Sequence, residues 1–322
     1  MEIQFPGFFD IQVNGFAGVD FNRPSNPEDI ETAVKAIRKT GVTAFLPTLI
    51  TSTTVHFARC ARVLLDNWAE EFAGIHMEGP WISAEDGPRG AHNKAAVCAA
   101  SIDDFKRRQD SAQGRIILVT LAPEVPGAIQ MIEYLAGIDI KVAIGHSQAA
   151  PGMIRDAVQA GATLSTHLGN GCAGQLPRHP NLLWEQLANV QLFASLIVDG
   201  HHLPPATVKT FVRAKSPERA LLITDAIAAA GCPPGRYLLG EVEVELDANG
   251  RVSPPGKPWL AGSALTMPVA VSNTVSFTGL PLMEVLKMAT ENPAHYLGMT
   301  ARGCVTAEWD EVAQNLEIRN VA

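Results

Sequence analysis

The feature that most constrains the fold of this 322-residue chain is an alternation between short apolar runs rich in β-branched residues and longer amphipathic stretches. Short runs of this composition are typical of buried strands, and the stretches between them have the periodicity of helices. A repeated strand and helix builds parallel βα units. The runs predicted as strands are Phe8–Val13, Val42–Leu49, Phe72–Met77, Ile116–Leu121, Lys141–Ile144, Thr163–Thr166, Leu192–Val198 and Ala220–Thr224.

Eight such units favour a closed (β/α)8 barrel of the TIM type over the alternative, an open doubly wound sheet. The helices between them carry end signals: residues 27–41 have acidic residues in the first turn and close on Gly41, and residues 151–161 close on Gly161. Barrels of this kind form single domains of more than 200 residues. We therefore expect one domain over residues 1–322, with the barrel at about 6–300.

The pattern changes after the eighth predicted strand. Residues 236–260 alternate apolar and polar side chains on either side of Asn249-Gly250, which predicts an inserted β-hairpin. Residues 266–297 read as helix. The tail, residues 303–322, is expected to form a strand that packs with the hairpin into a reduced small β-layer.

Composition excludes several classes of protein. Hydrophobic residues make up 47% and charged residues 18%, which is typical of a globular chain. The net charge of −8 and the absence of a basic block argue against nucleic acid as a partner, and no apolar run is long enough for a membrane span. The start of the chain has no secretory pattern, and the five cysteines are scattered without a C-x-x-C pair. We expect a cytoplasmic protein with reduced thiols.

Polar side chains cluster where the predicted strands end. In a barrel of this type the catalytic groups lie at the carboxyl ends of the strands, so these side chains should meet at one mouth. They are Glu78, His146, His167, His202 and Asp225, which end or follow the third, fifth, sixth, seventh and eighth runs.

One carboxylate and two imidazoles, Glu78, His146 and His167, make a three-ligand set for a catalytic zinc with a position left for water. Asp225 would then accept the proton of that water. Taken by itself, each histidine is more often a structural residue than a metal ligand. Asp225 by itself could cap the following turn through its side-chain oxygen. Buried charges need partners, so the joint pattern favours a metal site over these separate readings.

Nine segments, in order from about residue 6 to about residue 298, resemble a known family. They are PGFFDIQVNGFAGVDFN, GIHMEGPWIS, GAHNKAAV, TLAPE, GHSQA, THLGNG, VDGHHL, LITDAIAAAG and LAGSALTM. Together they are similar to the motifs of the N-acetylglucosamine-6-phosphate deacetylases of the amidohydrolase superfamily. The resemblance implies metal ligation by Glu78, His146 and His167 and catalysis by Asp225.

The same resemblance implies residues that contact the substrate. These are His202, His92, Asn170, Gly171 and Arg178, of which the arginine resembles one that reaches the phosphate in a neighbouring subunit, so a homodimer is implied. The chain carries Gln12 and Asn14 where many amidohydrolases have two histidines. We therefore expect one divalent ion, zinc before iron, manganese or cobalt, with Gln12 and Asn14 hydrogen-bonding Glu78 or a bound water.

Two further departures concern the family's small β-domain. The first barrel strand begins close to Met1, so the N-terminal half of that domain is expected to be missing, and the tail differs from the usual ending. The implied reaction is hydrolysis of the acetamide of N-acetyl-D-glucosamine 6-phosphate to D-glucosamine 6-phosphate and acetate. The alternatives are another N-acetylhexosamine phosphate such as N-acetylgalactosamine 6-phosphate, a different amide or cyclic-amide hydrolase, and an inactive sugar-phosphate binder.

Overall fold

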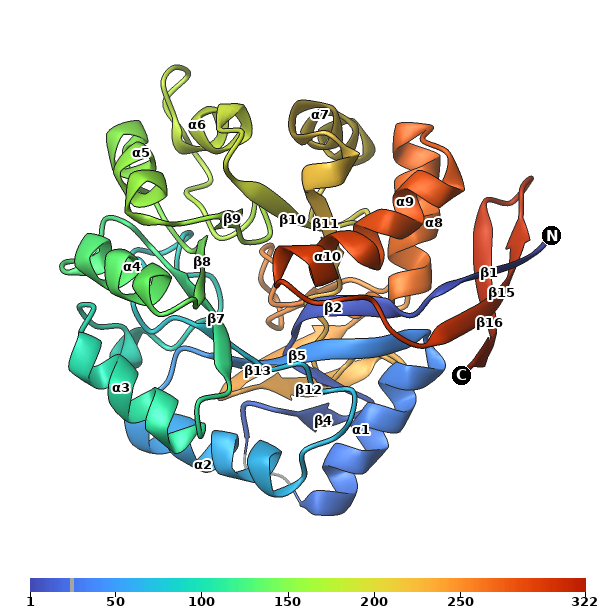
Figure 1. Cartoon of the computed structure of the whole chain (residues 1–322), viewed down its shortest axis with the longest axis horizontal. Coiled ribbons are helices and arrows are strands. Elements are labelled where there is room, and N and C mark those ends of the chain that lie inside the picture. Colours follow the sequence, from blue (N-terminus) through green and yellow to red (C-terminus); the bar gives the residue numbers. More distant parts are fainter. Residues whose placement is uncertain (24–25) are drawn as a thin grey trace.

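Eight parallel strands form the centre of the computed structural model, which describes residues 1–23 and 26–322 (Figure 1). They follow one another around the sheet, from the last to the first in chain order. The strands are β2 (Phe8–Val13), β5 (Val42–Ile50), β6 (Ile75–Glu78), β7 (Ile116–Leu121), β8 (Lys141–Ile144), β9 (Leu164–Ser165), β10 (Phe193–Ile197) and β11 (Ala220–Ile223). A bridge between Val13 and Ala226 brings the two outer strands together, so the predicted (β/α)8 barrel is confirmed.

Helices surround the barrel (Figure 1). They are α1 (Pro27–Lys39), α2 (Thr54–Asp66), α3 (Ile102–Ser111), α4 (Ala128–Gly137), α5 (Pro151–Ala160), α6 (Leu182–Ala188), α7 (Pro205–Lys215), α8 (Met267–Thr278), α9 (Leu282–Ala289) and α10 (Glu291–Tyr296). In α1 the Asp29 side chain accepts from the backbone of Asn26, and the buried face has helical spacing. Helix α5 ends at Gly161, whose φ of 118° suits glycine.

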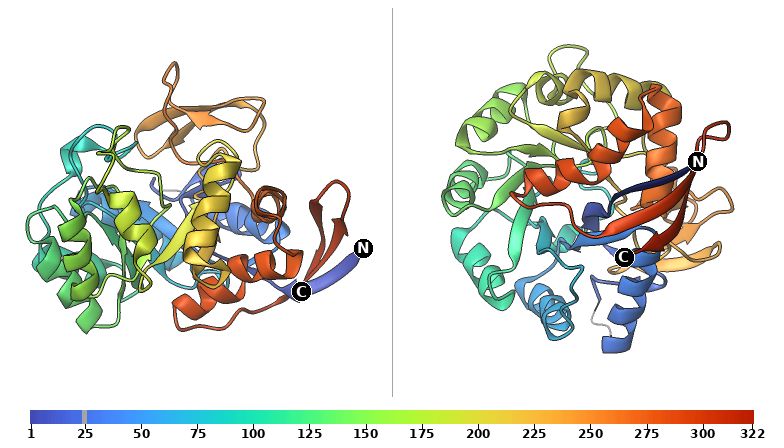
Figure 2. Two further views of the ribbon diagram at one scale, coloured as in Figure 1. Left: turned by 90° about the horizontal axis from the view of Figure 1, so that it is seen from above. Right: turned by 45° about the vertical axis from the view of Figure 1, so that its right-hand side comes forward.

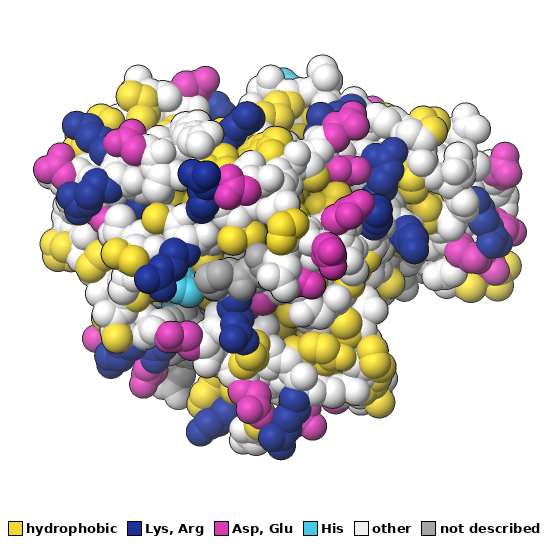
Figure 3. Space-filling view, turned by 90° about the horizontal axis from the view of Figure 1, so that it is seen from below, with side chains coloured by type: hydrophobic (Ala, Val, Ile, Leu, Met, Phe, Trp, Pro, Cys, Tyr) yellow, Lys and Arg dark blue, Asp and Glu magenta, His cyan; other side chains and the backbone are white. Residues whose placement is uncertain are grey.

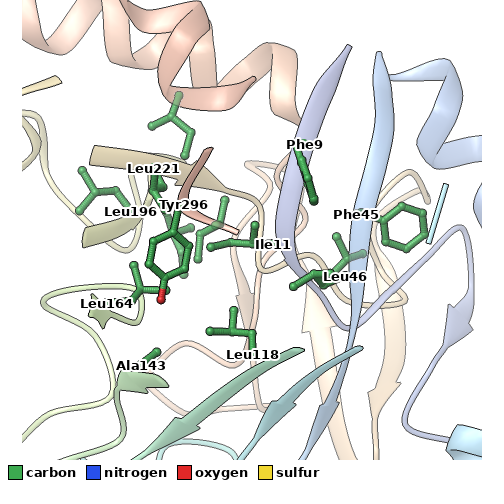
Figure 4. Packing of buried hydrophobic residues seen from close by; sticks show 14 of the residues in the cluster. Phe9, Ile11, Phe45, Leu46, Leu118, Ala143, Leu164, Leu196, Leu221 and Tyr296 are labelled. Atoms are coloured by element: carbon green, nitrogen blue, oxygen red, sulfur yellow. The ribbon is translucent and has the colours of Figure 1, made fainter. Parts of the chain in front are cut away.

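Apolar side chains from alternate strand positions fill the barrel (Figure 4). Those that meet inside it include Ile11, Leu46, Leu118, Leu164 and Leu221, none more than 1% exposed. Such an interior is a packed core and leaves no channel along the axis. A ligand can therefore reach the barrel only at the ends of the strands.

The insertion after the barrel is a three-stranded antiparallel sheet, one strand more than the predicted hairpin. It consists of β12 (Gly235–Leu239), β13 (Val242–Leu246) and β14 (Val252–Ser253). The predicted Asn249-Gly250 turn joins β13 to β14, and a tighter turn at Gly240, with φ of 57°, joins β12 to β13. The sheet stands over one end of the barrel (Figure 2, left, orange). Asn93 donates to Glu241 at 2.8 Å and anchors it to the rim.

The expectation that the tail packs with this insertion is wrong. Strands β15 (Cys304–Asp310) and β16 (Asn315–Val321) form a separate sheet with β1 (Glu2–Pro6), on another side of the molecule (Figure 2). Strand β1 precedes the barrel and offers β15 an unpaired edge, and the α-amino group of Met1 donates to the carbonyl of Trp309 at 2.7 Å. The chain before the barrel thus contributes one strand to a small β-sheet, where none was expected.

The surface agrees with the composition. On the face shown in Figure 3, acidic and basic side chains are interspersed, with no single-sign field of the kind that attracts nucleic acid. Within the described part of the chain, no helix has the length and apolar character needed to cross a lipid bilayer.

Candidate active site

The strand-end side chains meet in one cavity of about 1500 Å³ beneath the inserted sheet. It is lined by all five of the strand-end residues, Glu78, His146, His167, His202 and Asp225. The strands bring these five side chains together because each apolar run ends where the packed interior of the barrel ends. The cavity thus lies at the mouth that the sequence predicts.

Three atoms in this cavity form a nearly equilateral triangle. Glu78 Oε1, His146 Nε2 and His167 Nε2 are each 3.1 Å from the other two. Around a tetrahedral zinc with bonds of about 2.0–2.1 Å, two ligand atoms lie about 3.3 Å apart. The three donors therefore fit a divalent ion. His146 Nδ1 donates to the carbonyl of Pro88 at 2.9 Å, which leaves Nε2 free to ligate.

The charges of the triangle suit a cation. Burial alone would raise the pKa of Glu78. The positive charge of His146 and the hydrogen bond that His146 donates outweigh burial and hold this pKa well below its usual range. Glu78 is thus a carboxylate although it is only 2% exposed. A buried carboxylate facing two imidazoles needs a proton or a metal ion between them.

His92 lies on the other side of His146. Its Nε2 is 3.2 Å from His146 Nε2 and 3.8 Å from Glu78 Oε2, so these three residues form a second, less regular triangle. Because one imidazole nitrogen has a single lone pair, His146 cannot ligate at both centres. The equal 3.1 Å edges favour the triangle that contains His167. Burial, followed by the charge of His146, lowers the pKa of His92 well below its usual value, so His92 is neutral.

Asp225 faces the triangle from the end of β11. Its Oδ1 accepts from Asn14 Nδ2 at 2.7 Å and from Gln12 Nε2 at 3.2 Å. Gln12 Nε2 also donates to Glu78 Oε1 at 3.0 Å, so this one amide bridges both carboxylates. Burial, and then the negative charge of Glu78, raise the pKa of Asp225 to about 6. Asp225 is therefore ionised at neutral pH and close to the point at which it takes up a proton.

His202, Asn170 and Gly171 also line the cavity. His202 Nδ1 lies 2.6 Å from Asp199 Oδ2, so its Nε2 is left to meet a ligand. A Cβ on Gly171 would come within 2.9 Å of His146 Nδ1, and its φ of 56° lies in the left-handed region, so glycine is required beside this ligand. Arg178 is exposed and is absent from the described lining of its own chain's cavity.

The sequence pattern did not predict two residues that orient the histidines of the site. Asp199 and Thr51 orient His202 and His92, the latter through a 2.7 Å contact between Thr51 Oγ1 and His92 Nδ1. The spacing of three between Asp199 and His202 is a signal that could have been read from the sequence. His76, two residues before Glu78, contacts the carbonyl of Ile11 and the hydroxyl of Thr120 in the barrel interior.

Comparisons with known proteins agree with this geometry. The amidohydrolase family model matches residues 3–309. The chain is 35% identical over 312 residues to the N-acetylglucosamine-6-phosphate deacetylase of Bos taurus, across 92% of this chain and 75% of that protein. It is 34% identical over 306 residues to the N-acetylgalactosamine-6-phosphate deacetylase of Escherichia coli O157:H7, a match that covers 92% of this chain and 79% of that protein. A solved structure of the N-acetyl-D-glucosamine-6-phosphate deacetylase of Mycobacterium smegmatis, in complex with N-acetyl-D-glucosamine-6-phosphate, matches with a TM-score of 0.92 and 30% identity. The match covers 100% of this chain and 85% of that chain.

Proposed function

Because this chain belongs to the amidohydrolase family, we propose that it hydrolyses the acetamide of N-acetyl-D-glucosamine 6-phosphate to D-glucosamine 6-phosphate and acetate. The observation that carries the proposal is the 3.1 Å triangle of Glu78, His146 and His167 with the ionised Asp225 beside it. A metal-ligand set with an adjacent proton acceptor is the arrangement that hydrolysis of an unactivated amide needs.

Glu78, His146 and His167 would hold one divalent ion, zinc in preference to iron, manganese or cobalt. When bound, such an ion lowers the pKa of water and polarises a carbonyl. Asp225 takes a proton from the attacking water as the oxygen adds to the acetyl carbon. It returns a proton to the sugar nitrogen as the carbon–nitrogen bond breaks, because an amine anion is a poor leaving group. His202 Nε2, with its ring oriented by Asp199, faces the acetamide oxygen where negative charge develops.

The remaining residues are assigned to the sugar phosphate. Asn170, Gly171 and His92 lie on the cavity wall beside the metal ligands, where they can bind sugar hydroxyls and phosphate oxygens. Arg178 is exposed and lies outside the wall of its own cavity, which is the position expected of a residue that acts in a partner's site. We therefore propose a homodimer in which Arg178 reaches the phosphate bound by the other subunit.

We also place this reaction in the cytoplasm. All five cysteines are free thiols, as is usual in a reducing compartment. The proposed partner is the small amino-sugar phosphate, without nucleic acid or membrane.

A panel of N-acetyl sugars tests the proposed substrate. Metal-loaded protein should release acetate from N-acetylglucosamine 6-phosphate with a higher kcat/KM than from N-acetylglucosamine or from N-acetylgalactosamine 6-phosphate. The galactosamine epimer belongs in the panel because a relative of nearly equal similarity is named for it. A higher kcat/KM with N-acetylgalactosamine 6-phosphate would change the assigned substrate but would leave the assigned reaction, hydrolysis of an acetamide, unchanged. Failure to release acetate from every sugar in the panel would overturn the function.

The role of Arg178 gives a prediction of its own. Arg178→Ala should raise KM for the phosphorylated sugar about tenfold or more while hardly changing turnover of the unphosphorylated one, because a guanidinium binds phosphate through two parallel hydrogen bonds. The control is Arg213→Ala, since Arg213 is also exposed and is absent from the described cavity wall. Equal changes with both sugars would make Arg178 an ordinary surface residue and remove this support for the dimer.

A further inference from the structure

The barrel closes between its first and last strands by an irregular set of bonds. Strand β11 ends at Ile223, before the site. The residues that follow make single, separate backbone hydrogen bonds to the chain at the end of β2. Asp225 N donates to Gln12 O at 3.0 Å, and Asn14 N donates to Ala226 O at 2.7 Å. The backbone that carries the catalytic aspartate is therefore not held by a regular strand ladder on that side.

A buried carboxylate on β2 takes over part of this role. Asp10 is 1% exposed, and its Oδ2 accepts from the backbone N of Thr224 at 3.2 Å and from the Thr224 hydroxyl at 2.5 Å. Its Oδ1 accepts from Gln12 N at 3.2 Å. One side chain thus ties the residue before Asp225 to the strand that supplies Gln12 and Asn14. A buried carboxylate with several donors is costly to replace.

Thr224 and Ser263 complete the contacts from the other side. The Thr224 hydroxyl, while donating to Asp10, accepts from Ala226 N at 3.1 Å. Ser263 Oγ donates to the carbonyl of Thr224 at 2.5 Å, and Ser263 N donates to the carbonyl of Asp225 at 3.1 Å. Each polar backbone group of residues 224 and 225 therefore has a partner in β2 or in the segment around Ser263.

The backbone held in this way is unusual. Asp225 has a φ of 50°, in the left-handed region that residues other than glycine enter uncommonly. Aspartate tolerates this region better than most residues, but a residue remains there only where its surroundings fix it. With this backbone, Asp225 Oδ1 comes within 2.7 Å of Asn14 Nδ2 and faces the metal ligands.

We propose that Asp10, Thr224 and Ser263 are positioning residues that hold Asp225 in its left-handed conformation and so direct its carboxylate at the reacting atoms. The inference rests on the proposed function, because it presumes that Asp225 transfers the proton. None of the three lines the cavity among the residues described there, so each acts through Asp225 and not through the substrate.

Replacing the Thr224 hydroxyl tests the proposal. Thr224→Val keeps the shape of the side chain but cannot donate to Asp10 or accept from Ala226. Misplacement of a catalytic group by about 1 Å can cost on the order of 100-fold in rate, so kcat should fall about 10–100-fold. KM and metal content should stay near wild type, because the binding residues and the ligands are untouched. Thr224→Ser, which keeps the hydroxyl, should restore kcat to within about threefold of wild type.

A second variant covers the case in which Thr224→Val does not fold. Ser263→Ala removes the bond to the Thr224 carbonyl and leaves the backbone bond to Asp225, so kcat should again fall with KM unchanged. Its control is Ser272→Ala, which removes a buried hydroxyl bonded to Pro268 O at 2.8 Å on α8, away from the cavity.

The outcomes separate this inference from the proposed function. Folded Thr224→Val or Ser263→Ala protein with kcat within about threefold of wild type would overturn the positioning role, as would Thr224→Ser protein as slow as Thr224→Val. Asp225→Asn, measured in the same assay, reports on the proton-transfer role alone. If that variant is slow while the positioning variants are fast, the proposed function stands and this inference fails.

Discussion

Asp225→Asn is expected to lower kcat by about 10²–10⁴-fold, the usual contribution of a general acid–base group. The asparagine has the same shape, and its carbonyl oxygen can still accept from Asn14 and Gln12, which donate to Oδ1 in the wild type at 2.7 and 3.2 Å. Its amide cannot take up the proton of the attacking water. Fold and metal content should therefore survive while turnover is lost, as measured by steady-state kinetics, circular dichroism and elemental analysis.

Asp156→Asn is the matched control for this change. Asp156 is exposed on α5 and is absent from the described cavity wall, so its replacement should leave kcat unaltered. A kcat for the Asp225 variant within a few-fold of wild type would reassign Asp225 to a structural role. Loss of bound metal along with turnover would point instead to Asp225 as a ligand.

The barrel could be predicted because its strands are marked locally. Each predicted strand overlaps an observed one, since a run that is buried on both faces must be apolar along its length. The ends of the strands were less accurate, because pairing with neighbours sets them. The third predicted strand begins at Phe72, but there the chain makes only one isolated bridge, to Phe45, and β6 begins at Ile75.

The candidate site was predictable for a related reason. A charged residue directly after an apolar strand stands out, and parallel strands bring such residues to one end of the barrel. This reasoning reaches Glu78, His146 and His167, which the structure places 3.1 Å apart. It does not reach Asp10, because a single acid inside a strand carries no sign of its partner 214 positions away.

The pairing of the tail could not be read from the sequence either. Residues 304–321 alternate well enough to predict strands, but alternation does not say which edge they join. The register between β1 and β15, from Glu2 opposite Glu308 to Pro6 opposite Cys304, depends on where the barrel leaves the two ends of the chain. Long-range strand pairing is thus a property of the assembled fold.

Elemental analysis of protein purified without added metal should find about one equivalent of divalent metal per chain, zinc first. Gln12 and Asn14 stand where a second ion would need ligands, yet Nε2 of Gln12 and Nδ2 of Asn14 donate to the carboxylates of Glu78 and Asp225. An amide that presents N–H groups offers a cation no lone pair. Chelation should abolish turnover, and one equivalent of zinc should restore it.

The three-residue ligand set gives this prediction its control. His146→Ala removes one corner of the triangle and should lose most of the bound metal together with turnover. His295→Ala removes an exposed histidine on α10, so metal content and kcat should stay at wild-type values. Two equivalents of metal, both required for full activity, would contradict the single-ion site, and Gln12 and Asn14 would then have to turn their oxygens toward a second ion.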